Sequence, residues 1–151
     1  MSWGSAAFWS FLAGAFACAV LCAWILPRDD DRSDREATAL ALGATSLWGL
    51  VAAATGSDSA TAAFVEPLRN LAWLGLVYRL FASGGPEAGF TAVRPVLVAL
   101  IGVELLHPAA LLLLSQVPAS HPVQASAFPL VVLLRLTFAV GALLLCHHLY
   151  R

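Results

Sequence analysis

Lysine is absent from the chain, and charged residues of every kind are scarce. Of the 151 residues 11% are charged and 60% are hydrophobic, and the mean hydropathy is +0.83, whereas soluble domains carry about 25% charged residues. The formal net charge of -1 offers no basic surface, so we expect no nucleic-acid partner. The composition indicates an integral membrane protein whose first partner is the lipid bilayer.

Motifs of soluble enzymes are missing as well. The chain contains no glycine-rich phosphate loop, no GxSxG, no HExxH and no CxxC, the patterns that mark nucleotide sites, nucleophile elbows and metal or redox centres. We expect no catalytic residue, no cofactor and no metal site. An intramembrane enzyme built on buried glutamate and histidine would carry no such motif, and this alternative stays open.

Five apolar segments each approach the roughly 20 residues that span a bilayer. They cover residues 3–27, 37–55, 61–82, 92–115 and 128–150. The connectors between them are too short to hold a soluble domain, and no basic region precedes the first segment, which favours a spanning helix over a signal peptide. The sequence predicts one all-α transmembrane domain over 1–151, a compact bundle of five helices.

Arginine placement predicts the orientation of these helices. The residues concerned lie in the first connector, around the third connector and at the end of the chain, namely Arg28, Arg32, Arg35, Arg79, Arg94 and Arg151. The second and fourth connectors have none. Because cytoplasmic loops are enriched in arginine and lysine, the N-terminus is expected outside and the C-terminus in the cytoplasm.

Five ionisable residues lie inside the apolar segments. Glu66 and Arg69 are three residues apart, as are Glu104 and His107, and Arg135 lies in the last segment. At 1.5 Å per residue all five fall about 8 to 17 Å below the outer ends of their helices, in one layer. In hydrocarbon each costs at least ~2.5 kcal/mol unless it is paired or hydrated.

Three explanations of this layer stay open. It can be a structural ion-pair network that fixes helix register. It can be a ligand or proton site, because Pro67 and Pro108 free backbone carbonyls and His107 can exchange a proton with a neighbour. It can be a transport pathway, although no internal repeat supports alternating access.

Small residues recur every four positions in the first two segments. One stripe is Ser10, Gly14, Cys18 and Cys22, and the other is Ala41, Thr45, Gly49 and Ala53. Such stripes let backbones approach closely, so the two segments are expected to pack together with Gly14 and Gly49 at the contact. A homodimer through one stripe is the alternative.

Cysteine and histidine near the cytoplasmic side are candidate metal ligands. Cys18 and Cys22 lie one helical turn apart, and Cys146 adjoins His147 and His148. Thiolate and imidazole suit zinc or copper. Cysteine is also a small residue that packs well between helices, and we prefer this interpretation.

Two short motifs resemble a known family. Glu66-Pro67-Leu68-Arg69-Asn70-Leu71-Ala72-Trp73 is similar to the Glu-x-Leu-Arg-x-x-Ala-Trp element in the membrane region of the sensor histidine kinase associated with the exosortase/PEP-CTERM system. The stretch from Leu143 to Arg151, LLLCHHLYR, resembles a leucine-rich Glu-Gln-Leu-Tyr-Arg stretch in the same proteins. His147 and His148 depart from that pattern.

The resemblance implies a function for the chain. It would be the non-enzymatic signal-input domain of a two-component kinase in the bacterial inner membrane, linked to exopolysaccharide and protein sorting. The phosphoacceptor histidine and the ATP-binding boxes of the family have no counterpart in residues 1–151, so no catalytic residue carries over. A small transporter using the ionisable layer and a non-catalytic assembly subunit are the alternatives.

Reporter fusions test the predicted orientation. A reporter that is active only in the cytoplasm should be active after Arg151 or within 28–36 and inactive within 56–60, because only the first two sites lie in arginine-bearing regions. Reporter activity measured in intact cells, with fusion levels checked by immunoblot, decides the point. Activity within 56–60 would contradict the orientation.

Overall fold

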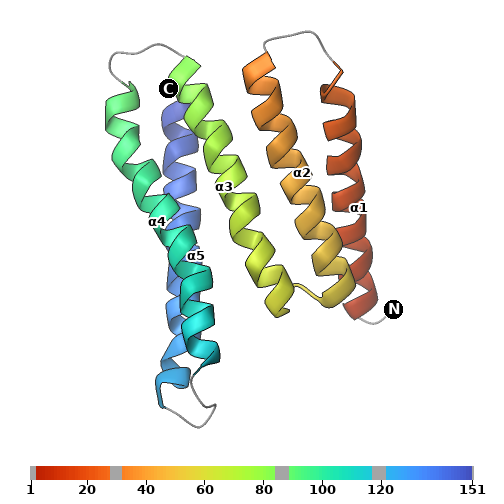
Figure 1. Ribbon diagram of the computed structural model, residues 1–151, viewed down its shortest axis with the longest axis vertical. Helices are drawn as coiled ribbons and strands as arrows, with labels where there is room; N and C mark the ends of the chain where they lie inside the picture. Colours follow the sequence, from red (N-terminus) through yellow and green to blue (C-terminus); the bar gives the residue numbers. More distant parts are fainter. Residues whose placement is uncertain (1–2, 28–31, 84–88, 117–121, 151) are drawn as a thin grey trace. The chain divides into compact units, whose positions relative to one another are not determined.

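The computed structural model describes residues 3–27, 32–83, 89–116 and 122–150. Within them all regular structure is helical: α1 Trp3–Ile25, α2 Arg32–Thr55, α3 Ala60–Ser83, α4 Gly89–Ser115 and α5 Pro122–Tyr150 (Figure 1). The predicted all-α class with five helices is confirmed.

The chain divides into two compact units. The first comprises residues 1–80, with α1, α2 and most of α3, and the second comprises residues 81–151, with α4 and α5. In the first unit α1 and α2 are antiparallel and pack along their length, and in the second α4 and α5 do the same (Figure 1). The expected single domain over 1–151 stays a prediction.

Two helices begin five or more residues earlier than the apolar pattern predicted. α2 starts at Arg32 instead of residue 37, and α5 starts at Pro122 instead of residue 128. The apolar pattern marks what lipid can cover, whereas a helix continues into water wherever its residues allow it. Asp34 in the first turn of α2 complements the positive helix end, and proline suits the first position of α5. The predicted connectors 28–36 and 116–127 were therefore drawn too long.

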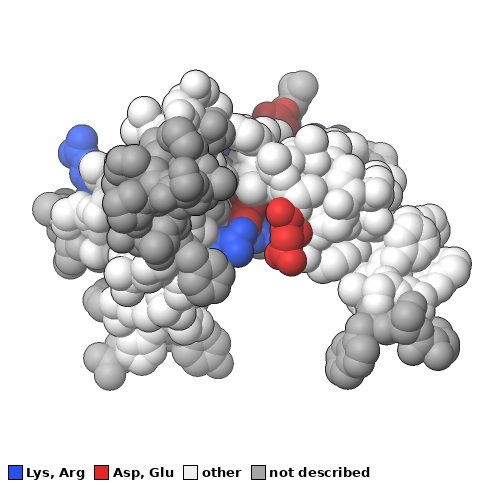
Figure 2. Space-filling view, turned by 90° about the horizontal axis from the view of Figure 1, so that it is seen from below, with Lys and Arg blue, Asp and Glu red and all other residues white. Residues whose placement is uncertain are grey.

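Within the part of the chain that the structure describes, four helices have the length and composition to cross a membrane. They are Gly4–Ile25, Asp34–Thr55, Val93–Leu113 and Pro129–His147, and they make this a multi-pass membrane protein. Most of the described surface in Figure 2 carries no charge. α3 is long enough but less apolar, because Glu66, Arg69 and Asn70 lower its hydropathy. The predicted fifth span at α3 therefore stays a prediction.

A tight turn joins α2 to α3, at the place that the sequence predicted. Gly56 has a φ of 89°, a left-handed conformation that glycine adopts without strain, and its N–H donates to the carbonyl of Ala52 at 2.9 Å. Ser59 then caps α3, since its hydroxyl accepts a hydrogen bond from the N–H of Ala62 at 3.1 Å. The turn reverses the chain direction, so the consecutive helices α2 and α3 run antiparallel.

Close packing of α1 on α2 occurs at Gly49. A Cβ there would lie 3.0 Å from the Cβ of Ala15 and 3.2 Å from the carbonyl oxygen of Phe11. Further along, the Cys22 thiol donates to the carbonyl of Ala39 at 3.3 Å. The predicted contact between the two segments is confirmed on the α2 side, and Cys22 serves as a small packing residue.

Gly14 does not take part in this contact. No heavy atom lies within 4 Å of the position that its Cβ would occupy. The face of α1 turned to α2 carries Phe11 and Ala15, one position later than the predicted stripe, so the prediction for Gly14 was wrong. The second unit has a comparable contact, because any side chain at Gly141 of α5 would overlap Leu100 of α4.

Gly49 and Gly14 form a matched pair for mutation. Gly49→Leu should lower the stability of the protein in detergent by about 1 to 3 kcal/mol, because the side chain must displace the α1 backbone. Gly14→Leu adds the same atoms to open space and should change stability by less than about 0.5 kcal/mol. Unfolding midpoints by circular dichroism measure both effects. An equal loss for the two variants would be incompatible with the helix contact described.

Candidate functional site

Arg69 is the centre of a polar cluster in the first unit. It lies nine residues after the start of α3, about 14 Å along the helix axis. Its Nε and Nη2 atoms both donate to Oδ1 of Asn70, at 3.1 and 2.9 Å. Nη2 also lies 3.9 Å from Oε1 of Glu66, and the Arg69 and Glu66 side chains are 21% and 16% exposed. The predicted pairing of Glu66 with Arg69 is therefore present, at the outer limit of ion-pair distance.

An aromatic ring of α2 completes the enclosure of the guanidinium. The central carbon of Arg69 lies 4.2 Å from the ring centroid of Trp48, a cation–π geometry that is strongest for indole. Trp48 in turn meets the ring of Phe11 on α1 edge-on, with centroids 5.5 Å apart. We call Trp48, Glu66, Arg69 and Asn70 the Arg69 cluster. Together with Phe11 it connects all three helices of the unit through consecutive side-chain contacts.

A second link holds α3 to α2 one turn further along. The indole N–H of Trp73 donates to the hydroxyl of Thr45 at 2.9 Å. The Thr45 hydroxyl donates its own proton to the carbonyl of Ala41 at 2.8 Å, so its lone pairs remain to accept from Trp73. The direction of each bond is thus fixed by the other.

Sequence spacing explains why these side chains meet. Glu66, Arg69, Asn70 and Trp73 occupy positions i, i+3, i+4 and i+7 of α3, which share one helix face. Thr45 and Trp48 are likewise three apart on α2. The spacing could have identified Asn70 and Trp73 as site residues. Trp48 gave no signal, because an aromatic residue in an apolar segment is indistinguishable from a packing residue.

The other predicted site residues belong to the second unit. Glu104 and His107 are 4% and 3% exposed and lie one turn apart on α4. Pro108 has no N–H for the carbonyl of Glu104 four residues earlier. Arg135 is exposed on α5. Burial of the Glu104 and His107 pair on one face of α4 agrees with the sequence pattern. The gathering of all five residues in one layer stays a prediction.

Two cavities adjoin α1 and α2. The first, of about 480 Å³, is lined by residues of α1, by the end of α2 and by the turn at 56–59, and Phe11, Thr55, Asp58 and Ser59 belong to its lining. We call it the turn cavity. Its hydroxyls form a network in which Thr55 and Ser59 lie 2.6 Å apart. Phe11 thus contacts both the turn cavity and Trp48 of the Arg69 cluster.

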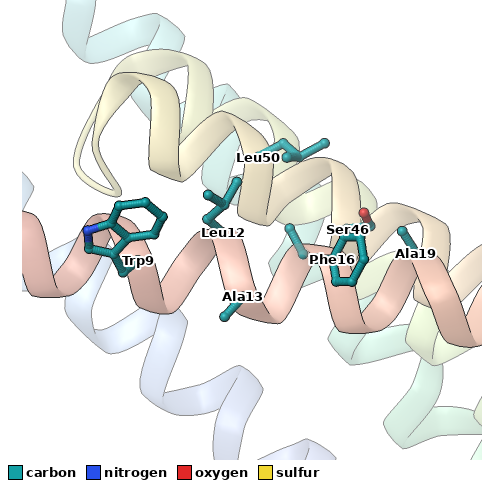
Figure 3. A pocket seen from close by; sticks show the side chains of 8 residues that line it. Trp9, Leu12, Ala13, Phe16, Ala19, Ser46 and Leu50 are labelled. Atoms are coloured by element: carbon teal, nitrogen blue, oxygen red, sulfur yellow. The ribbon is translucent and has the colours of Figure 1, made fainter.

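The second cavity is almost wholly apolar. It measures about 490 Å³ and lies between α1 and α2, where Trp9, Leu12 and Phe16 of α1 line it and the hydroxyl of Ser46 on α2 lies beside Phe16 (Figure 3). Trp9 and Phe16 are exposed. A single hydroxyl among apolar side chains gives no basis for specific recognition, and we assign this surface to contact with lipid tails.

Comparison of the chain with protein-family models, with curated proteins and with solved structures gave no match. The similarity of Glu66–Trp73 and Leu143–Arg151 to the kinase family therefore stays a prediction.

Removing one charge of the cluster should be worse than removing two. Arg69→Gln leaves the Glu66 carboxylate in an apolar region without the Arg69 charge, and it should destabilise the protein by about 2 to 4 kcal/mol. The double variant Glu66→Gln with Arg69→Gln should recover about 1 kcal/mol of that loss. Unfolding in mixed detergent measures the three free energies. A double variant that loses the sum of both single effects would show that the two charges are not coupled.

Proposed function

We propose that residues 1–151 form a membrane-embedded signal-input domain of a bacterial two-component histidine kinase. The observation that carries this proposal is the line of contacts from the turn cavity through Phe11 and Trp48 to Arg69. A cavity at a helix end that touches a charged cluster inside the helices is an arrangement through which an occupant can displace a helix. In this proposal the kinase core lies outside these residues.

The position of the resembling motif supports the kinase family. Glu66, Arg69 and Trp73, its ionic and indole residues, all make contacts at the α2–α3 interface or within its cluster. Polar residues in a membrane helix are expensive, and here they serve one helix interface. A motif whose residues hold α3 against α2 suits a helix whose position is regulated. The sorting and exopolysaccharide system is the pathway that this resemblance implies.

In the proposed arrangement α3 also crosses the inner membrane, which makes five spans in all. The N-terminus then lies outside and the C-terminus in the cytoplasm. The composition of α3 is less apolar than that of the four candidate spans, but Trp48 covers the Arg69 charge and Asn70 accepts two of its hydrogen bonds. Protein groups thereby supply the solvation that lipid cannot. The turn cavity then opens toward the envelope, where a signal would enter.

Two measurements distinguish this function from the alternatives. The product of the natural reading frame, in inner-membrane vesicles with labelled ATP, should gain phosphate on histidine. The purified protein in liposomes with a pH-sensitive dye should show no proton flux above that of empty liposomes. Flux that Arg69→Gln or Glu104→Gln abolishes would establish the transporter alternative, and absence of both activities would leave the assembly subunit.

Trp48→Leu tests the contact line within that assay. Because it removes the ring between Phe11 and Arg69, we expect it to lower histidine phosphorylation severalfold. Phe16→Leu, at an exposed position of α1 outside the line, is the matched control and should leave phosphorylation unchanged. Equal phosphorylation in both variants would rule out transmission through Trp48.

A further inference from the structure

A third cavity lies between α2 and α3, at the end of the unit opposite the turn cavity. It measures about 330 Å³, and its lining runs from Glu36 near the start of α2 to Arg79 near the end of α3. We call it the Arg79 cavity. Glu36 is two residues from the start of the apolar span Asp34–Thr55, so the cavity lies where charged side chains reach the headgroup region.

The walls of the Arg79 cavity are small residues and leucines. Ala37 and Ala72 take little space, and a Cβ at Gly75 would meet no heavy atom within 4 Å. Leu40 also lines the cavity and is 66% exposed, so the hollow is continuous with the surface that lipid tails cover. An occupant can therefore place an apolar chain along α2 while its polar end remains in the cavity.

The two ionisable residues of the lining have opposite charges. A guanidinium binds phosphate oxygens through two parallel hydrogen bonds, and a carboxylate accepts hydrogen bonds from a primary ammonium group. An occupant that binds to both Glu36 and Arg79 carries a phosphate group and an ammonium group. A volume of about 330 Å³ is at the lower end of small-molecule sites and suits a compact headgroup.

We propose that the Arg79 cavity binds the headgroup of a phosphatidylethanolamine molecule, with its phosphate on Arg79 and its ammonium group on Glu36. Phosphatidylglycerol has no cation for Glu36, and the trimethylammonium group of phosphatidylcholine has no N–H to donate. The site thereby selects one lipid class by charge and by hydrogen bonding. This inference does not depend on the proposed kinase function.

Lipid titration of the purified, delipidated chain tests the proposal. Binding of dioleoyl phosphatidylethanolamine, phosphatidylcholine and phosphatidylglycerol is followed by native mass spectrometry. Phosphatidylethanolamine should bind about tenfold more tightly than phosphatidylcholine, the ratio that one charge-assisted hydrogen bond can give. Glu36→Gln should remove this preference, Glu36→Asp should retain it, and Arg79→Gln should weaken all three lipids.

Matched controls separate the cavity from the general lipid surface. Gly75→Leu fills the cavity and should weaken phosphatidylethanolamine about tenfold. Gly43→Leu adds the same side chain to α2 at a position that is also open but outside the cavity lining, and Arg94→Gln removes an exposed arginine of α4. Both should bind as the unchanged protein does. Circular dichroism and gel filtration verify that each variant is folded.

Three results would overturn the proposal. Equal affinity for phosphatidylethanolamine and phosphatidylcholine would show that the ammonium group is not recognised. Tighter binding of phosphatidylglycerol, unaffected by Glu36→Gln, would show a site for anionic lipid. Equal weakening by Gly75→Leu and Gly43→Leu would place the lipid elsewhere on the helices.

Discussion

A guanidinium held between apolar helices has to be solvated largely by the protein itself, and the contacts of the first unit meet this requirement. Asn70 accepts two hydrogen bonds from Arg69, Glu66 lies beside it as the counter-charge, and Trp48 presents its ring face. No one of these contacts replaces water alone. Together they provide an acceptor, a charge and a polarisable surface, the three things that water would otherwise supply.

The packing of α1 on α2 positions the ring that covers Arg69. Trp48 directly precedes Gly49, whose missing side chain allows the α1 backbone to approach. That approach brings Phe11 edge-on to Trp48 and restricts the rotation of the indole. A contact between two apolar helices thus orients the group that solvates a charge on a third helix. Stability and site geometry are coupled in this unit, so a substitution at Gly49 should also alter the contact between Trp48 and Arg69.

How far the sequence could predict this structure depends on which residues carried a periodic signal. Helical class and the turn at Gly56 followed from hydropathy and from turn chemistry, and the Glu66–Arg69 pair followed from its spacing. The start of α2 at Arg32 could not be read from apolar pattern, since lipid imposes no pattern on residues in water. The prediction that Gly14 lies at the contact failed because several faces of α1 carry small residues. Only the partner helix decides which face is used. Trp48 required the three-dimensional structure.

The geometry of the Arg69 cluster is compatible with the movable element that the proposed function requires. A rigid structural pair would hold Arg69 and Glu66 in close contact, but their atoms are 3.9 Å apart while the hydrogen bonds to Asn70 are 3.1 and 2.9 Å long. The guanidinium can therefore shift its stronger bonds between two acceptors on the same helix face while Trp48 continues to cover it. The proposed function requires that these two arrangements have similar free energy, because a bound ligand can then redistribute them. A ligand in the turn cavity would act on this balance through Phe11, because that ring restricts the indole on which the guanidinium rests.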